Sequence, residues 1–298
     1  MNEQPMIRRR GLLHVALAAI MVPAAMNSRV LAKAGEPFAA DLAGLEAGMR
    51  GARLGVCVLD AAGVKATGHR MDERFPMCST FKLLVAGATL ARVDRGEEKL
   101  ENHVAFGEAD LVPYSPITGS KQGVGLDIET LCLAAVTASD NTAANLLLAR
   151  LGGPAGLTAW LRTIGDNVTR LDRIEPALNA AAPGDKRDTT TPRAMTQTIR
   201  RLLLGDVLST TSREHLTDWL VHNTTGGAKL RAGLPVGWRI GEKTGAGSHG
   251  TSNDTGIVWP PQGMPLFVAS YLTGSRADRG AQDALHAKVG VLIAAHFG

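Results

Sequence analysis

The sequence of 298 residues has few aromatic residues and few cysteines. Phe, Trp and Tyr make up 4% of it, and its three cysteines are Cys57, Cys78 and Cys132. An odd number of cysteines leaves at least one thiol free, and none of the three has the spacing of a metal or redox motif. Most such cysteines are small buried hydrophobes. We therefore expect a globular fold without a disulfide framework.

The chain also has no surplus of positive charge once its N-terminus is set aside. Residues 1–34 contain five of the 32 Lys and Arg and one of the 28 Asp and Glu, which leaves 27 of each in the remaining chain. Nucleic-acid binding requires an excess of Lys and Arg, so no nucleic-acid partner is predicted. The histidines lack the spacing of a zinc hydrolase, and no metal or other cofactor is predicted.

The N-terminus has the features of an export signal. A basic head joins an apolar run over residues 7–26, and the small residues of LAKA precede a predicted cleavage after Ala34. The pair Arg9–Arg10 indicates the twin-arginine type. A membrane anchor is less favoured because the run is short and contains Pro23. No later segment is apolar enough to cross a bilayer, so we predict a periplasmic or secreted monomer without membrane contact.

Hydrophobic periodicity predicts a mixed α/β (α+β) fold. Strand patterns lie near both ends of the chain and helical patterns in its middle, which favours one antiparallel sheet with helices packed on it and an inserted helical lobe. Helices are expected over 37–49, 79–96, 127–153 and 279–297, and strands over 53–60, 64–70, 237–245, 254–260 and 265–274.

The predicted domains follow from this pattern. Residues 35–77 and 222–298 form the sheet domain, and residues 78–221 form the helical domain. The helical domain includes an irregular loop over 173–188, within a stretch that has three prolines and no sustained periodicity. Loops of that length inside a domain are usually functional, and a cleft between two lobes is the expected place for a site.

Three short motifs occur in a fixed order along the chain. They are Ser79-x-x-Lys82 at a helix start, Ser139–Asp140–Asn141 in the helical lobe and Lys243–Thr244–Gly245 at the end of a strand. Each motif alone is weak, because a capping serine or a strand end explains it equally well. Positions i and i+3 share one helix face, so Lys82 can exchange a proton with Ser79. Together, the three motifs predict a serine nucleophile with a nearby amine.

This set of motifs resembles class A β-lactamases and penicillin-binding proteins. Glu175 and Asn179 on the irregular loop favour the β-lactamases, because penicillin-binding proteins lack that pair. The resemblance implies hydrolysis of a β-lactam through an acyl-enzyme. Its implied catalytic residues are Ser79, Lys82, Ser139 and Glu175, and its implied substrate-binding residues are Tyr114, Asn141, Asn179, Lys243, Thr244, Gly245 and Ala246.

The resemblance also implies several details of the site. The proton of Ser79 passes to Lys82 or, through a water, to Glu175, and these alternatives stay open. The backbone N–H groups of Ser79 and Ala246 form the oxyanion hole. The Glu175–Pro176 bond is expected to be cis, and an ion pair between Arg173 and Asp188 is expected to close the loop.

The sequence departs from many relatives where a second cation binds the substrate carboxylate. Ser252 occupies one usual position of that cation, and the candidates here are Lys229, Arg276 and Arg279. The two disulfides found in some relatives are excluded, because Ala86 and Gly247 stand where a second cysteine would be needed. The stretch GAGSHG, residues 245–250, spells a dinucleotide-binding pattern, but a strand pattern follows it where such a site needs a helix.

Two rival functions share most of these residues. A D,D-peptidase would share Ser79, Lys82, Ser139 and Lys243 but would release bound β-lactams slowly, and Glu175 argues against it. A sensor that stays acylated and signals would need a transmembrane segment, for which the sequence shows no candidate.

Overall fold

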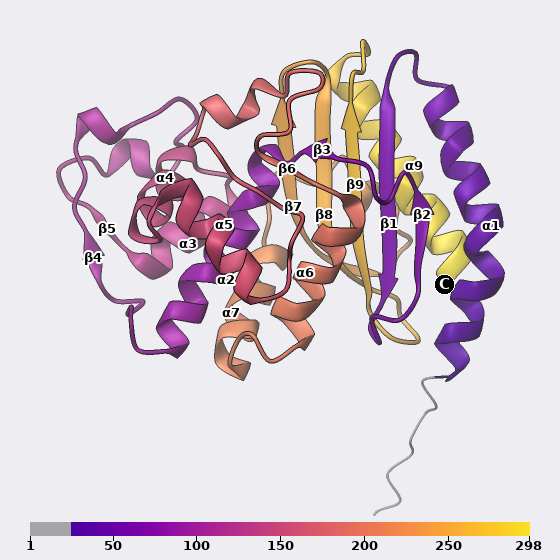
Figure 1. The fold of residues 1–298 in the computed structure, drawn as a ribbon, viewed down its shortest axis with the longest axis horizontal. Coiled ribbons are helices and arrows are strands. Elements are labelled where there is room, and N and C mark those ends of the chain that lie inside the picture. The colour runs from indigo at the N-terminus through magenta and orange to yellow at the C-terminus, as the bar shows by residue number, and fades with distance from the viewer. Residues whose placement is uncertain (1–24) are drawn as a thin grey trace, which may run out of the picture.

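A five-stranded antiparallel sheet is assembled from both ends of the chain (Figure 1). The computed structural model describes residues 25–298. The strands are β1 (Arg53–Asp60), β2 (Ala66–His69), β7 (Arg239–Gly247), β8 (Thr251–Trp259) and β9 (Leu266–Thr273), in the order β2-β1-β9-β8-β7. The expected strands are thus confirmed, and β7, which carries Lys243, is the edge strand beside the helical lobe.

Two terminal helices cover one face of the sheet. Helix α1 (Ala25–Ala47) and helix α9 (Arg279–Phe297) bury apolar side chains against β1, β8 and β9. Phe38 of α1 meets Phe297 of α9 edge to face, with 5.1 Å between ring centroids. This layer accounts for the two outer helical patterns expected from the sequence.

Helices from the middle of the chain pack around α2 (Phe81–Asp94). Every residue of α2 from Phe81 to Ala91 is buried, so α2 is the central helix of this lobe. Its neighbours are α3 (Ile128–Thr137), α4 (Asn141–Arg150), α5 (Gly153–Thr163) and α7 (Thr210–Val221). Their apolar faces form one core with the second face of the sheet.

Short elements complete the chain. Helix α6 (Pro192–Leu204) packs on the sheet, where Arg200 Nε donates to the Ala61 carbonyl at 2.7 Å. The remaining elements are α8 (Leu230–Gly233), the 3-10 turns η1 (Cys78–Thr80), η2 (Glu108–Asp110), η3 (Thr118–Ser120) and η4 (Ala177–Ala180), and the paired strands β3 (Phe75–Pro76) with β6 (Thr189–Thr190) and β4 (His103–Val104) with β5 (Leu126–Asp127). The domain boundaries remain a prediction.

The expectation of a single helix over residues 127–153 was wrong. The chain breaks between α3 and α4, where Ser139 has φ of +60°, in the left-handed region. Asp140 then caps α4 by accepting a hydrogen bond from the Ala143 N–H at 2.9 Å. Apolar periodicity continues across the break, so the hydrophobic pattern alone could not reveal it.

The predicted export signal lies mostly outside the described residues, and Arg9 and Arg10 lie outside them entirely. Helix α1 begins at Ala25, before the predicted cleavage point at Ala34. From Ala25 to the C-terminus, no helix is long and apolar enough to cross a membrane.

Asp140 should be a main determinant of stability. Its buried carboxylate also accepts hydrogen bonds from the Ile117 N–H at 2.9 Å, the Thr118 N–H at 2.9 Å and the Thr118 hydroxyl at 2.7 Å. Hydrogen bonds to a charged group contribute more than neutral ones, so Asp140→Ala should lower the free energy of unfolding by about 3 kcal/mol or more, measured by urea denaturation.

Asp127→Ala is the matched control, because Asp127 caps α3 through a single hydrogen bond from the Thr130 N–H at 2.7 Å. Loss of a single cap costs about 1 kcal/mol. Equal costs for the two substitutions would contradict the structural role assigned to Asp140.

Candidate active site

Ser79 lies in a tight turn that the edge strand holds in place. The turn η1 begins at Cys78, which has φ of +45°, and Ser79 is buried at the start of α2. The Asn253 amide on β8 donates to the carbonyls of Pro76 and Met77, both at 2.9 Å. A Cβ added at Gly245 would lie 2.7 Å from the Met77 oxygen, so only glycine permits β7 to approach this closely.

Lys82 is fully buried one turn below Ser79 and is surrounded by oxygen atoms. Its Nζ lies 3.1 Å from Ser79 Oγ, 2.7 Å from the Ser139 carbonyl, 2.5 Å from Asn141 Oδ1 and 3.1 Å from Glu175 Oε1. Burial lowers the pKa of Lys82 from its ordinary value, although the carboxylate of Glu175 opposes this effect. The lowered pKa favours the neutral amine, which can accept a proton from Ser79.

Ser139 connects Lys82 to the third motif. Its hydroxyl accepts a hydrogen bond from Lys243 Nζ at 3.0 Å and lies 3.4 Å from Lys82 Nζ. Burial and, after it, the charge of Lys82 hold the pKa of Lys243 well below its ordinary value. Ser139 therefore lies between two amines, and this contact joins the helical lobe to β7.

Asn141 and Tyr114 form the opposite side of the cleft. Asn141 Nδ2 donates to the Pro113 carbonyl at 2.7 Å, and its backbone N–H donates to the Tyr114 carbonyl at 3.0 Å. Tyr114 has φ of +65° and is 62% exposed. The Ser-Asp-Asn motif thus fixes the segment that presents the tyrosine ring to the cleft.

Glu175 reaches Ser79 from the irregular loop. Its Oε1 accepts a hydrogen bond from Ser79 Oγ at 3.1 Å, and its Oε2 accepts one from Asn179 Nδ2 at 2.5 Å. The carboxylate is buried, and the peptide bond to Pro176 is cis, as expected. The contact with Ser79 is direct, whereas the sequence-based path to Glu175 ran through a water.

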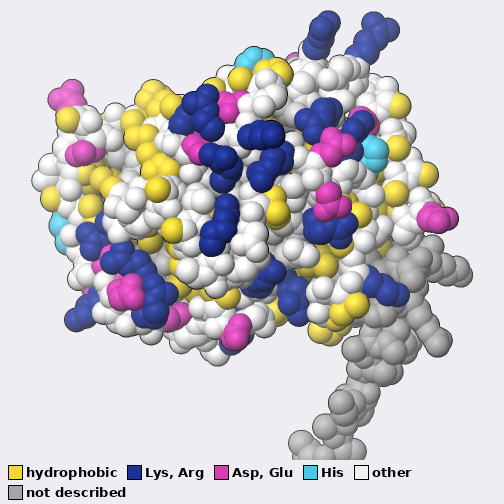
Figure 2. Space-filling model, viewed as in Figure 1, with side chains coloured by type: hydrophobic (Ala, Val, Ile, Leu, Met, Phe, Trp, Pro, Cys, Tyr) yellow, Lys and Arg dark blue, Asp and Glu magenta, His cyan; other side chains and the backbone are white. Residues whose placement is uncertain are grey.

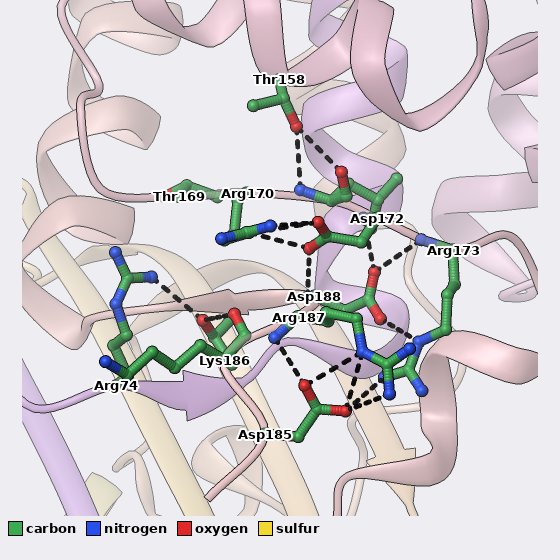
Figure 3. Close-up of polar contacts among 12 residues, drawn as sticks. Arg74, Thr158, Thr169, Arg170, Asp172, Arg173, Asp185, Lys186, Arg187 and Asp188 are labelled. Atoms are coloured by element: carbon green, nitrogen blue, oxygen red, sulfur yellow. Dashed lines mark hydrogen bonds and ion pairs between the residues drawn. The ribbon is translucent and has the colours of Figure 1, made fainter.

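The loop closes at its base through Arg173 and Asp188 (Figure 3). Arg173 Nε lies 2.5 Å from Asp188 Oδ2, and Asp188 Oδ1 accepts the backbone N–H groups of Asp172 at 2.7 Å and Arg173 at 2.9 Å. The expected ion pair is therefore confirmed. The Asp188 carbonyl also accepts the Met77 N–H at 2.9 Å, which links the loop base to the turn that carries Ser79.

These groups line a cleft with a volume of about 530 Å³ between the lobes. Eight of the eleven predicted site residues have atoms in its wall, and Lys82, Glu175 and Lys243 do not. The wall is formed by Ser79, Tyr114, Ser139, Asn141, Asn179, Thr224, Thr225, Lys229, Thr244, Gly245, Ala246, Arg279 and Asp283.

Of the three candidate cations, Lys229 and Arg279 line the cleft, and Arg276 does not. Lys229 Nζ lies 2.5 Å from both Asp283 Oδ1 and Ser252 Oγ, so its charge is already compensated. Within residues 25–298, no carboxylate lies within ion-pair distance of Arg279.

The cysteines do not offer a rival nucleophile. Cys57, Cys78 and Cys132 are free and buried. Burial raises the pKa of the Cys57 thiol to about 11 and that of Cys78 still further, so both stay protonated at neutral pH. The glycine pattern at 245–250 runs from the end of β7 into the turn before β8, so a strand follows it and not the helix that a dinucleotide site needs. The described residues contain no cluster of His, Cys, Asp and Glu that could hold a metal.

Comparisons with known proteins agree with this geometry. Residues 37–297 match the sequence model of the β-lactamase enzyme family. The chain is 46% identical over 253 residues to β-lactamase L2 of Stenotrophomonas maltophilia, which covers 85% of this chain and 83% of that protein. It is 48% identical over 223 residues to β-lactamase CTX-M-8 of Citrobacter amalonaticus. That match covers 75% of this chain and 77% of that protein.

A solved structure is also similar, that of a class A β-lactamase described as the last common ancestor of Gram-negative bacteria (GNCA4). It has 59% sequence identity and a TM-score of 0.86 over 88% of this chain and 99% of that one. The chain belongs to the class A β-lactamases. The predicted family, fold and hydrolytic activity are therefore confirmed.

The sequence did not reveal every residue that shapes this class A site. Asn145 of α4 holds the backbone of Glu175 from both sides: its Oδ1 accepts the Glu175 N–H and its Nδ2 donates to the Glu175 carbonyl, both at 2.9 Å. Thr225 Oγ1 lies 2.5 Å from Thr244 Oγ1 in the cleft wall. An asparagine inside a helix is a weak signal for Asn145, because Asn disfavours helix interiors. Thr225 has no such signal.

The loop base should control the position of Glu175. Asp188→Asn removes the negative charge that Arg173 contacts, while Asp185 at 3.5 Å from Arg173 Nη2 can still partly compensate that arginine. The loop should loosen, and because small displacements of a catalytic group are costly, deacylation of a good substrate should slow about a hundredfold. Stopped-flow kinetics with a penicillin measure this rate.

Asp185→Asn is the control, because it removes the more distant carboxylate from the same arginine. It should leave deacylation nearly unchanged. The melting temperature of both variants should change little, because loops open locally at lower cost than the core. The main effect of Asp188→Asn should therefore appear in the deacylation rate. A normal deacylation rate in Asp188→Asn would refute the role of the ion pair.

Proposed function

We propose that the residues of this cleft perform both halves of β-lactam hydrolysis. Ser79 Oγ attacks the lactam carbonyl and forms an acyl-enzyme, which splits one difficult step into two easier ones. Lys82 Nζ and Glu175 Oε1 each lie 3.1 Å from Ser79 Oγ, so either can accept its proton. The lowered pKa of Lys82 supports the amine as acceptor.

Charge that develops on the substrate is stabilised from β7 and η1. The backbone N–H groups of Ser79 and Ala246 are the proposed oxyanion hole, and one such donor contributes roughly 2.7–4 kcal/mol to lowering the barrier. Ser139, which contacts both amines, passes a proton to the departing ring nitrogen. Lys243 and Thr244 meet the substrate carboxylate, and Arg279, which has no carboxylate partner in the described part of the chain, supplies a second positive charge.

The contacts of Asn179 support the second half of the proposed reaction, the hydrolysis of the acyl-enzyme. Its Nδ2 holds Glu175 Oε2, while its Oδ1 is buried without a hydrogen-bond partner within the described residues. Buried polar atoms rarely lack a partner, so this oxygen is available to a water that also donates to Glu175. In the proposed mechanism, this water attacks the acyl-enzyme with Glu175 as general base.

This arrangement also separates the rival functions. A D,D-peptidase or a sensor forms the same acyl-enzyme but releases it slowly, whereas the Glu175–Asn179 pair supports rapid hydrolysis. We further propose export through the signal at residues 1–34 and action as a monomer in the periplasm or outside the cell. The support for export is the basic head, the apolar run and the small residues before Ala34.

Glu175→Gln should give an enzyme that still forms the acyl-enzyme but hydrolyses it slowly. The amide cannot accept a proton, so deacylation should slow by about 10²–10⁴-fold, the usual contribution of a general base. Mixing with a penicillin should give a burst of one equivalent, and mass spectrometry should find the adduct on Ser79.

Glu129→Gln is the control, because Glu129 lies on the outer surface of α3 and, in the part of the chain that the structure describes, its ion-pair partner is His215 alone, at 3.6 Å. It should turn over like the parent. Turnover at the parent rate in Glu175→Gln would contradict the proposed role of Glu175. Slow hydrolysis of the acyl-enzyme in the parent itself would favour the D,D-peptidase or the sensor.

A further inference from the structure

A second cavity lies beside the base of the loop and shares no lining residue with the active-site cleft. Its volume is about 550 Å³. We call it the arginine cavity; apolar residues of α5 and of the segment after it line one part, and three arginines line another. The lining is Arg74, Pro154, Ala155, Thr158, Ala159, Arg162, Val168, Arg170, Leu171 and Asp172.

Within the described residues, two of the three arginines have no counter-ion. Arg74 Nη1 donates to Thr189 Oγ1 at 3.0 Å, and Arg162 Nη1 donates to the carbonyl oxygens of Asp166 and, at 2.7 Å, Thr169. From Ala25 to Gly298, no carboxylate lies within ion-pair distance of either guanidinium. Each therefore brings an uncompensated positive charge to a partly apolar wall, where like charges repel more strongly than in water.

The single carboxylate in the lining is already engaged. Asp172 binds Arg170 Nε at 2.9 Å through Oδ2, which also accepts the Asp188 N–H at 3.0 Å (Figure 3). These contacts fix Asp172 at the loop base, so it is not free to turn toward Arg74 or Arg162. Arg170 is exposed, and its Nη1 has no hydrogen-bond partner within the described residues.

The surface around the cavity is also positive. Lys186 and Arg187 are exposed on the end of the loop, and Figure 3 shows Lys186 beside Arg74 and Arg187 beside Asp185 and Arg173. Asp185, which precedes them, is shared by Arg187 at 2.8 Å and Arg173 at 3.5 Å. Figure 2 shows Lys and Arg side chains gathered in a band down the centre of this face. Such a field raises the local concentration of anions.

We propose that the arginine cavity binds a small organic oxyanion, such as a phosphate monoester. Planar guanidinium groups match the geometry of phosphate and carboxylate oxygens, and Arg74 and Arg170 have free N–H groups for them. The apolar wall from Pro154 to Ala159 covers the organic part of the ligand. A ligand cavity with an apolar wall and a few convergent polar groups is the usual form of a small-molecule site. The proposal is independent of the roles assigned in the active site.

The test is a titration of the isotope-labelled protein with phenyl phosphate, followed by amide NMR. Signals of Ala159, Val168 and Leu171 should shift with one saturating dissociation constant, whereas those of Gly245 and Ala246 report separately on anion binding in the cleft. Inorganic phosphate should shift the same cavity signals with weaker affinity, and neutral phenol should shift them least.

Arg74→Gln keeps a donor for Thr189 but removes the charge, and the dissociation constant for phenyl phosphate should rise about tenfold or more. Arg239→Gln is the matched control, because Arg239 stacks over the Trp259 ring at 4.6 Å, outside the cavity, and its loss changes the net charge equally. It should leave the affinity unchanged.

Three results would overturn the proposal: cavity signals that do not move, equal weakening in the two arginine variants, or phenol binding as tightly as phenyl phosphate. Inorganic phosphate binding as tightly as phenyl phosphate would overturn the role of the apolar wall.

Discussion

The site depends on one buried amine. Lys82 has no exposed side-chain surface, and its Nζ contacts oxygen atoms of Ser79, Ser139, Asn141 and Glu175. These residues come from η1, the break before α4 and the loop, which are far apart in sequence. A buried amine that lacked them would be costly, because an unpaired polar group loses its hydration without replacement. The same contacts that satisfy Lys82 therefore assemble the proposed catalytic residues.

The sheet gives this assembly a rigid frame. Gly245 allows β7 to lie against the Met77 carbonyl, Asn253 holds the same carbonyl from β8, and Asp188 accepts the Met77 N–H from the loop base. One short segment thus connects the nucleophile, the edge strand and the loop. Because catalytic geometry tolerates little displacement, the residues around Met77 matter to function although they touch no reacting atom.

The sequence allowed prediction of the proposed catalytic residues partly from local geometry and partly from the resemblance to class A β-lactamases, which alone singled out Glu175. Ser79 and Lys82 share a helix face, and Glu175 stands on a loop that its prolines and polar residues mark clearly. The break at Ser139 was missed, since an apolar pattern crosses it and a left-handed serine has no sequence signal. Asn145 was missed because its role is a contact with a segment 30 residues away. Such contacts follow from packing, which periodicity does not encode.

The most direct test of this account is the pKa of Lys82, measured by NMR of ¹⁵N-labelled lysine side chains across a pH titration. The account predicts that the pKa of Lys82 lies below the ordinary value of a lysine, because burial disfavours its charged form more than Glu175 favours it. Glu175→Gln should lower the pKa of Lys82 further by removing the opposing carboxylate. A pKa of Lys82 at or above the ordinary value of a lysine would contradict the claim that Lys82 accepts the proton of Ser79.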